Sequence, residues 1–144
     1  MFERMDHVAM SVKDMEKAVA FYQDVVGMEK VFDREFDTPM ARLIGVEGTR
    51  VRIVHMKFHD NVLELFDYHY PPGREPRADR QQSDYGLIHI GFLVDDFWAT
   101  YRDLLARGVT FLGEAVEIRP GVTVAYFRGA EYEVCEIREI LPQG

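Results

Sequence analysis

The sequence contains little cysteine, no long hydrophobic run and no excess of positive charge. Its 144 residues include a single cysteine, Cys135, so neither an intramolecular disulfide nor a zinc site made of cysteines alone can form. No apolar stretch approaches the roughly 18 residues that a membrane span requires. The N-terminal segment also lacks the apolar core of a signal peptide, so we expect a cytoplasmic protein without a membrane partner.

The charge balance is acidic, with 17 basic against 25 acidic residues and a formal net charge of −8. Nucleic-acid binding requires a basic face, so no nucleic-acid partner is expected. The polar segment 71–84 nevertheless carries Arg74, Arg77 and Arg80. These side chains are either a solvated linker surface, which the composition favours, or a grip for an anionic group of a substrate through forked hydrogen bonds.

The length is close to the ~150 residues typical of one domain, and the two halves of the chain repeat each other. The segment HVAMSVKDM, which begins at His7, aligns without gaps with HIGFLVDDF, which begins at His89. Further along the chain, VLEL aligns with VCEI, so that Glu64 matches Glu136. We therefore predict a single domain, 1–144, that consists of module 1 (about 5–70), a linker (about 71–84) and module 2 (about 85–141).

Each half has the pattern of a β-α-β-β-β module. Val8, Met10 and Val12 alternate with more polar residues, which is typical of a strand. Asp14 and Asp96 are then predicted N-caps of a helix. The other predicted strands are Lys30–Phe36, Ala41–Val46, Val51–His55, Val62–Tyr68, Leu87–Val94, Thr110–Leu112, Thr123–Arg128 and Glu133–Glu139.

The repeated histidines and glutamates indicate a shared site. A carboxylate within an apolar strand is costly to bury unless it is paired or bound to a metal. His7, Glu64, His89 and Glu136 would provide two imidazole nitrogens and two carboxylates, which suit one divalent ion such as Ni, Co, Fe, Mn or Zn. Such a ligand set leaves positions open for water or substrate, as a catalytic site requires.

The chain resembles the vicinal oxygen chelate superfamily, which includes glyoxalase I, methylmalonyl-CoA epimerase, extradiol dioxygenases and bleomycin resistance proteins. The resemblance covers nearly the whole chain. It depends on DHVAMSVKDMEKAVAFYQDVVGM, NVLELFDY, LIHIGFLVDDFWATYRDLLARGV and EVCEIRE. It implies an α+β fold of two βαβββ modules that form a curled, barrel-like mixed sheet around a metal site. The family's ligand positions map to His7, Glu64, His89 and Glu136, and a homodimer is implied.

The four-ligand pattern is closest to those of glyoxalase I and methylmalonyl-CoA epimerase. It implies a metal-dependent isomerase or lyase that moves an α-proton of a small carbonyl or thioester substrate through a metal-stabilised enediolate. Either Glu136 or Glu64 would be the catalytic base. One alternative is an Fe(II)-dependent dioxygenase that uses His7, His89 and Glu136, and another is a metal-free, drug- or ligand-binding resistance-type protein.

The remaining histidines and several aromatic residues are expected to have no part in the metal site. His55, His59 and His69 have no matched partner in the other half, so they are predicted to be surface or rim residues, and His69 is the one expected to face the pocket. Four aromatic residues are assigned to the core rather than to a substrate-stacking surface. These are Phe92, Trp98, Tyr101 and Tyr126.

Overall fold

The computed structural model describes residue 1 and residues 3–142. The chain folds into two compact units, of which unit 1 is Met1–Glu75 and unit 2 starts at Pro76. Within the described residues, no helix has the length and apolar character needed to cross a membrane.

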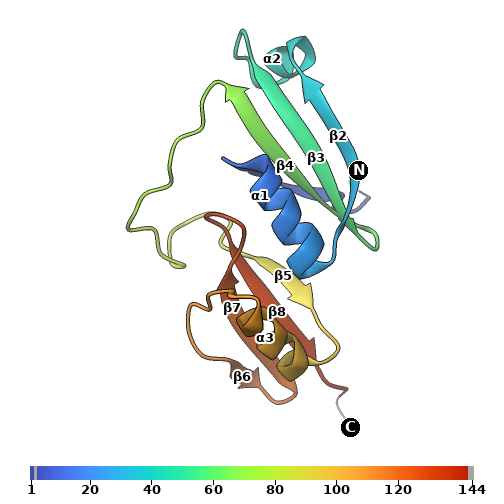
Figure 1. The fold of residues 1–144 in the computed structure, drawn as a ribbon, viewed down its shortest axis with the longest axis vertical. Helices are drawn as coiled ribbons and strands as arrows, with labels where there is room; N and C mark the ends of the chain where they lie inside the picture. The colour runs from blue at the N-terminus through green and yellow to red at the C-terminus, as the bar shows by residue number, and fades with distance from the viewer. Residues whose placement is uncertain (2, 143–144) are drawn as a thin grey trace. The chain divides into compact units, whose positions relative to one another are not determined.

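Unit 1 is a four-stranded mixed sheet with a helix on one face (Figure 1). Its strand order is β1-β4-β3-β2, with β1 parallel to β4 and the other neighbours antiparallel. The elements are β1 (His7–Ser11), α1 (Met15–Ala20), the π-helical turn η1 (Phe21–Val26), β2 (Glu29–Phe36), α2 (Thr38–Ile44), β3 (Arg50–Phe58) and β4 (Asn61–Tyr70).

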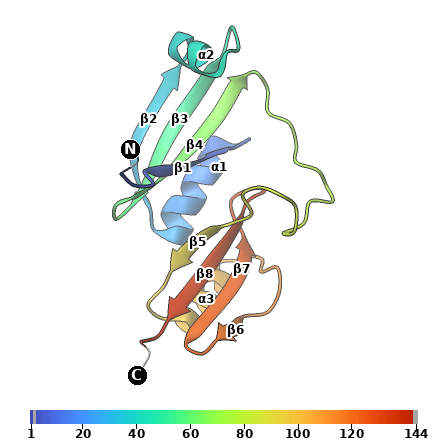
Figure 2. The same ribbon diagram turned by 180° about the vertical axis from the view of Figure 1, so that it is seen from behind.

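Unit 2 repeats this topology with shorter strands. Its strand order is β5-β8-β7-β6, with β5 parallel to β8. The elements are β5 (Ile90–Leu93), α3 (Phe97–Ala106), β6 (Val116–Arg119), β7 (Val122–Arg128) and β8 (Val134–Ile140). Helix α3 lies in front of its sheet in Figure 1 and behind it in Figure 2, so it covers one face only. The predicted α+β class with two related modules is confirmed.

Both helices begin where the sequence pattern places them. The Asp14 carboxylate accepts a hydrogen bond from the Lys17 backbone N–H at 3.0 Å, and Asp96 accepts one from the Ala99 N–H at 2.8 Å. Each cap satisfies a backbone donor that the first helical turn leaves without a partner. Gly27 follows the first helical segment with φ of 86°, a left-handed conformation that favours glycine.

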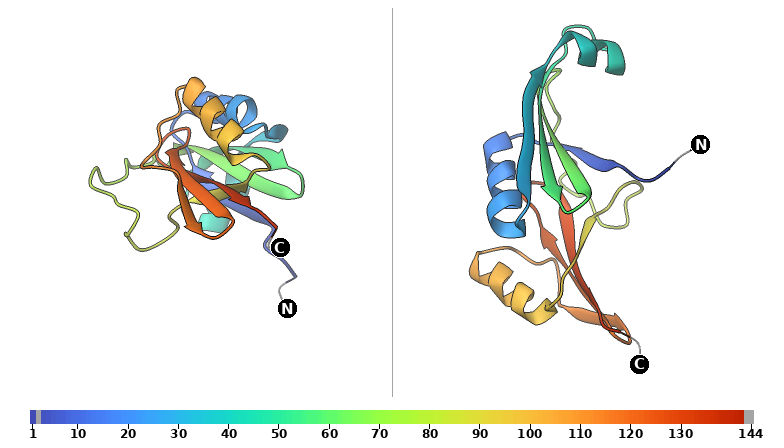
Figure 3. Two further views of the ribbon diagram at one scale, coloured as in Figure 1. Left: turned by 90° about the horizontal axis from the view of Figure 1, so that it is seen from below. Right: turned by 90° about the vertical axis from the view of Figure 1, so that its right-hand side faces the viewer.

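The main core of each unit lies between its helix and its sheet. In unit 1, Leu63 and Leu65 of β4 are buried, and α1 packs against this strand to one side of the sheet (Figure 3). In unit 2, Cys135 and Ile137 of β8 are buried in the same way, and α3 packs against β8. Strand side chains alternate between the two faces of a sheet. Glu64 and Glu136 each lie between two of these buried residues, so each lies on the face of its own sheet that α1 or α3 does not cover, here called the open face.

The open face of unit 1 carries a second, smaller apolar cluster. Its buried members come from α2 and β3, and aromatic side chains of β2 and β4 pack against them. The members are Met40, Val51, Ile53, Phe32, Phe36, Phe66 and Tyr68. The surface beside Glu64 is therefore predominantly apolar and aromatic.

Three details of the predicted secondary structure are wrong. Ala41–Val46 is not a strand, because its first four residues belong to α2, which begins after the Asp37 cap and is followed by the C-cap Gly45 with φ of 72°. Thr110–Leu112 forms only an isolated bridge between Phe111 and Phe127. The edge strand β6 was not predicted, because all four of its residues are exposed and it therefore lacks an apolar alternation.

Candidate metal centre

In unit 1, two histidines lie beside Glu64. His7 enters from β1 and places its Nε2 3.5 Å from Glu64 Oε2. His55 enters from β3 and places its Nε2 3.0 Å from Glu64 Oε1. The Glu64 side chain is 15% exposed, and those of His7 and His55 are 43% and 29% exposed, so the group lies at an accessible surface of the open face.

The orientation of His7 is set by its sequence neighbour. His7 Nδ1 lies in hydrogen-bond contact with Asp6 Oδ2 at 3.0 Å. Chiefly this hydrogen bond, and to a lesser degree the charge of Glu64, raises the pKa of His7, while burial opposes the rise. In the neutral tautomer whose proton lies on Nδ1 beside Asp6, Nε2 is the free acceptor nitrogen, which is the form in which a histidine binds a metal.

In unit 2, His89 and Glu136 repeat this pairing. His89 Nε2 lies 3.6 Å from Glu136 Oε2, and the two side chains are 26% and 10% exposed. The other ring nitrogen, His89 Nδ1, is shielded from solvent without a hydrogen-bond partner among the described residues. Unit 2 therefore places an imidazole and a carboxylate at the same place on its sheet as unit 1 does.

Tyr126 is a further neighbour of this pair. Its ring lies 5.0 Å from the His89 ring, centroid to centroid, and its backbone is the direct register partner of Glu136. Burial, followed by the charge of Glu136 and a hydrogen bond to it, raises the pKa of the Tyr126 hydroxyl. The phenol therefore stays protonated at neutral pH and can donate to the carboxylate.

The two His–Glu pairs fit the donor chemistry of a divalent metal. Separations of 3.5 and 3.6 Å exceed the range of about 2.7–3.2 Å for N–H···O hydrogen bonds. They match the spacing of two donors on one ion, roughly 3–3.6 Å for metal–ligand bonds of about 2.1 Å. Within the described ranges, no group of three or more His, Cys, Asp or Glu side chains has the arrangement of a complete metal site.

His55 and Tyr126 were assigned other roles from the sequence. His55 was predicted to be a surface or rim residue and Tyr126 a core residue, but both contact the glutamate of their unit. They occupy equivalent positions, because His55 pairs with Glu64 in the β3–β4 register and Tyr126 with Glu136 in the β7–β8 register. The sequence did hold a clue to the His55–Glu64 contact. The position of the turn between β3 and β4 determines which residues face each other across the hairpin.

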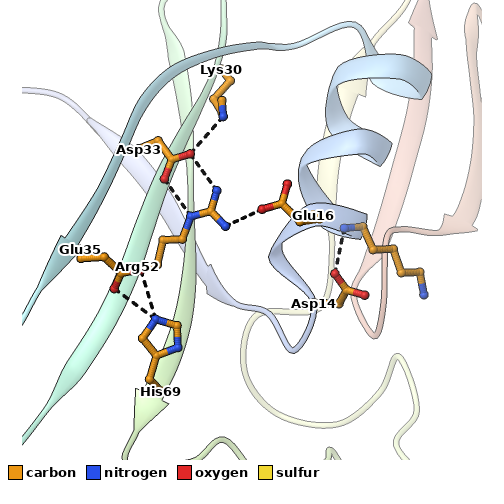
Figure 4. Close-up of polar contacts among 8 residues, drawn as sticks. Asp14, Glu16, Lys30, Asp33, Glu35, Arg52 and His69 are labelled. Carbon is orange, nitrogen blue, oxygen red and sulfur yellow. Dashed lines mark hydrogen bonds and ion pairs between the residues drawn. The ribbon is translucent and has the colours of Figure 1, made fainter.

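Other polar residues do not join these pairs. His69, predicted to face the pocket, lies instead 3.1 Å from Glu35 of β2 (Figure 4). In the linker, Arg77 forms an ion pair with Asp79, and Arg80 donates to the Leu87 carbonyl oxygen at 2.9 Å. These linker contacts fit a surface loop rather than a grip for a substrate.

Comparison with known proteins identifies the family. The model of the Glyoxalase/Bleomycin resistance protein/Dioxygenase superfamily matches residues 4–130. The chain belongs to this superfamily. The resemblance to the vicinal oxygen chelate superfamily is thereby confirmed. A glyoxalase family protein from Bacillus cereus shares the fold, with a TM-score of 0.88, 22% identity and coverage of 99% of this chain and 97% of that one.

Two curated members of the superfamily are similar in sequence. A 2-epi-5-epi-valiolone epimerase from an Actinomyces species is 34% identical over 122 residues, which are 80% of this chain and 65% of that protein. The human mitochondrial methylmalonyl-CoA epimerase is 30% identical over 118 residues, which are 80% of this chain and 60% of that protein. The chain thus spans less than two thirds of the length of either relative.

Proposed function

We propose that this superfamily member is a metal-dependent enzyme that moves an α-proton of a small carbonyl or thioester substrate, as an isomerase or a lyase. The observation that carries this proposal is the repeated pairing of an imidazole with a mostly shielded carboxylate on the open face of each sheet. We propose His7, Glu64, His89 and Glu136 as the metal ligands, with Ni, Co, Fe, Mn or Zn as the ion.

The two curated relatives favour the isomerase reaction. Both are named as epimerases, and their named substrates differ. Epimerisation next to a carbonyl group requires removal of a proton from one face of a carbon and its return to the other face. The shared element is thus the proton transfer and not one particular substrate.

The residues of this chain can perform the steps of such a transfer. A bound divalent ion supplies Lewis acidity, which makes a proton next to a carbonyl group easier to remove. Glu64 or Glu136 accepts that proton, since each carboxylate is mostly shielded from water. Inversion also requires a proton donor on the opposite face of the carbon, a role that the other glutamate would fill in its protonated form. Asp6 orients His7, and the Tyr126 phenol holds the position of Glu136.

Metal content of the purified protein tests this proposal. Elemental analysis should find about one divalent ion per chain, and His89→Ala or Glu136→Ala should abolish its binding, because each removes a proposed ligand. His59→Asn is the matched control. This exposed histidine lies in the β3–β4 turn with φ of 53°, which asparagine tolerates. Unchanged metal stoichiometry in His89→Ala and Glu136→Ala would overturn the assignment of the ligands.

Activity assays of the same proteins separate the candidate reactions. The proposal expects exchange of the substrate's α-proton with solvent deuterium, measured by NMR on carbonyl and thioester compounds, and loss of this exchange in Glu136→Gln or Glu64→Gln. Iron-dependent oxygen uptake that persists in Glu64→Ala would favour a dioxygenase. Stoichiometric ligand binding by metal-free protein would favour a binding protein. A homodimer and a cytoplasmic location stay predictions.

A further inference from the structure

Arg138 lies on the open face of unit 2, close to the His89–Glu136 pair. It follows Glu136 by two residues in β8, so the alternation of the strand places both side chains on the same face. Its register partners are Val124 of β7 and Leu93 of β5, whereas Tyr126 of β7 is the register partner of Glu136. Arg138 is therefore the next residue after Glu136 on this face of β8.

The guanidinium of Arg138 has no anionic partner within the part of the chain that the structure describes. The side chain is half-buried, and its Nε is shielded from solvent without any hydrogen-bond acceptor. Other arginines of the chain behave differently, because Arg52, Arg77 and Arg107 each form an ion pair with a carboxylate. A shielded charged donor without an acceptor is unfavourable, and a bound acceptor oxygen would relieve that cost.

The positive charge of Arg138 acts on the same surface as Glu136. At the Tyr126 hydroxyl, this charge lowers the pKa and so opposes the effects of burial and of Glu136. Arg138 therefore lies within electrostatic reach of the phenol that contacts Glu136. The row of the sheet that Arg138 occupies lies next to that of Glu136, so it borders the place where a molecule would contact His89 and Glu136.

We propose that Arg138 determines substrate specificity by binding a carboxylate of the substrate, so that the substrate class is a carbonyl compound with a second, anionic group. This inference rests on the proposed function, because it assumes that the reacting part of the molecule lies at the metal. The planar guanidinium presents its N–H donors in a fixed fork that matches a carboxylate, whereas lysine would offer only a point charge.

Two compounds of matched length test the role of Arg138. 2-Oxoglutarate and 2-oxopentanoate share an α-keto acid end that can chelate a metal, and only the first carries a distal carboxylate. Isothermal titration calorimetry on metal-loaded protein should show that wild type prefers 2-oxoglutarate by about tenfold or more. Arg138→Gln should abolish this preference, and Arg138→Lys should retain part of it. Arg107→Gln, at the exposed C-cap of α3, is the control and should keep it.

Metal content and thermal melting of each variant distinguish the possible failures. All variants should bind the metal as wild type does and unfold at similar temperatures. A preference that persists in Arg138→Gln, or a metal-loaded wild type that does not discriminate, would overturn the inference alone. Loss of the metal in Arg138→Gln would likewise overturn it, by showing that Arg138 supports the metal site. Wild-type protein that binds no metal would overturn the proposed function and the premise of this inference together.

Discussion

Glu64 and Glu136 occupy equivalent positions, but their side chains have different neighbours. Glu64 contacts two imidazoles, and the His55 ring stacks on Phe32 with 4.4 Å between centroids. Glu136 contacts one imidazole and the phenol of Tyr126. The duplicated scaffold therefore surrounds each carboxylate with a different donor, which provides a means to give the two glutamates different tasks.

Replacement of His55 by phenylalanine should weaken metal binding. His55→Phe keeps an aromatic ring against Phe32 but removes the nitrogen next to Glu64 Oε1, so the carboxylate loses one of the groups that orient it. Loss of such an orienting partner typically lowers metal affinity about 10- to 100-fold. Competition with a chelator of known affinity measures the change, and His59→Asn serves as the control. An affinity equal to that of wild type would show that His55 does not position Glu64.

At the scale of the elements, Arg52 connects three segments of unit 1. Its Nε and one terminal nitrogen donate to the two carboxylate oxygens of Asp33 in β2, both at 2.8 Å, and its other terminal nitrogen donates to Glu16 of α1 (Figure 4). Lys30 also contacts Asp33, at 3.0 Å. This cluster joins two neighbouring strands to the helix that covers them, on the face opposite Glu64.

Asp33→Asn should destabilise the protein by about 1–2 kcal/mol at neutral pH, because it replaces a forked, charge-assisted contact that is only partly exposed to solvent. Urea unfolding measures this difference. The exposed helix pair Asp103–Arg107 offers the control, since Asp103→Asn should cost no more than about 0.5 kcal/mol. Equal effects of the two substitutions would contradict a special role for the Arg52 cluster.

The contribution of Asp33 should also depend on pH. Hydrogen bonds from Arg52, and secondarily from Lys30, hold the pKa of Asp33 far below its usual value, although burial opposes this shift. As the pH falls, Asp33 is therefore protonated at a higher pH in the unfolded chain than in the folded chain. The stability difference between wild type and Asp33→Asn should be constant above about pH 5 and shrink as the pH falls below about 4. Unfolding curves between pH 7 and pH 3 measure this trend.

At the scale of the whole molecule, the proposed metal should contribute to stability. A ligand that binds only the folded state stabilises it by about 2.7 kcal/mol at one hundred times its dissociation constant. For a chain of this length, this corresponds to a rise in Tm on the order of 10 °C. Calorimetry of chelator-treated protein, with and without added metal, measures the rise.

The variants His89→Ala and Glu136→Ala should lose this response to metal. Their unfolding temperatures without metal should resemble that of chelator-treated wild type, because both side chains lie outside the main apolar core of unit 2. A metal-induced rise in Tm that is as large in these variants as in wild type would place the stabilising ion elsewhere.

The sequence by itself determined the repeated module, its helix starts and the matched histidines and glutamates. These features are local: an Asp14 or Asp96 cap satisfies backbone donors within three residues, and the alternation around Glu64 and Glu136 assigns them to a face. Segments whose pattern fits two structures were predicted less well. Ala41–Val46 is a short, mostly apolar run that could be a strand or part of a helix, but the Asp37 cap and the left-handed Gly45 place most of it in α2.

Only the tertiary structure decided which side chains complete the surroundings of each glutamate. His55 and Tyr126 reach Glu64 and Glu136 through cross-strand register. Such contacts join residues that are distant along the chain, so no periodicity within one segment encodes them. They follow from how hairpins close and strands pair, because one shift in register would move every side chain of a strand to the other face.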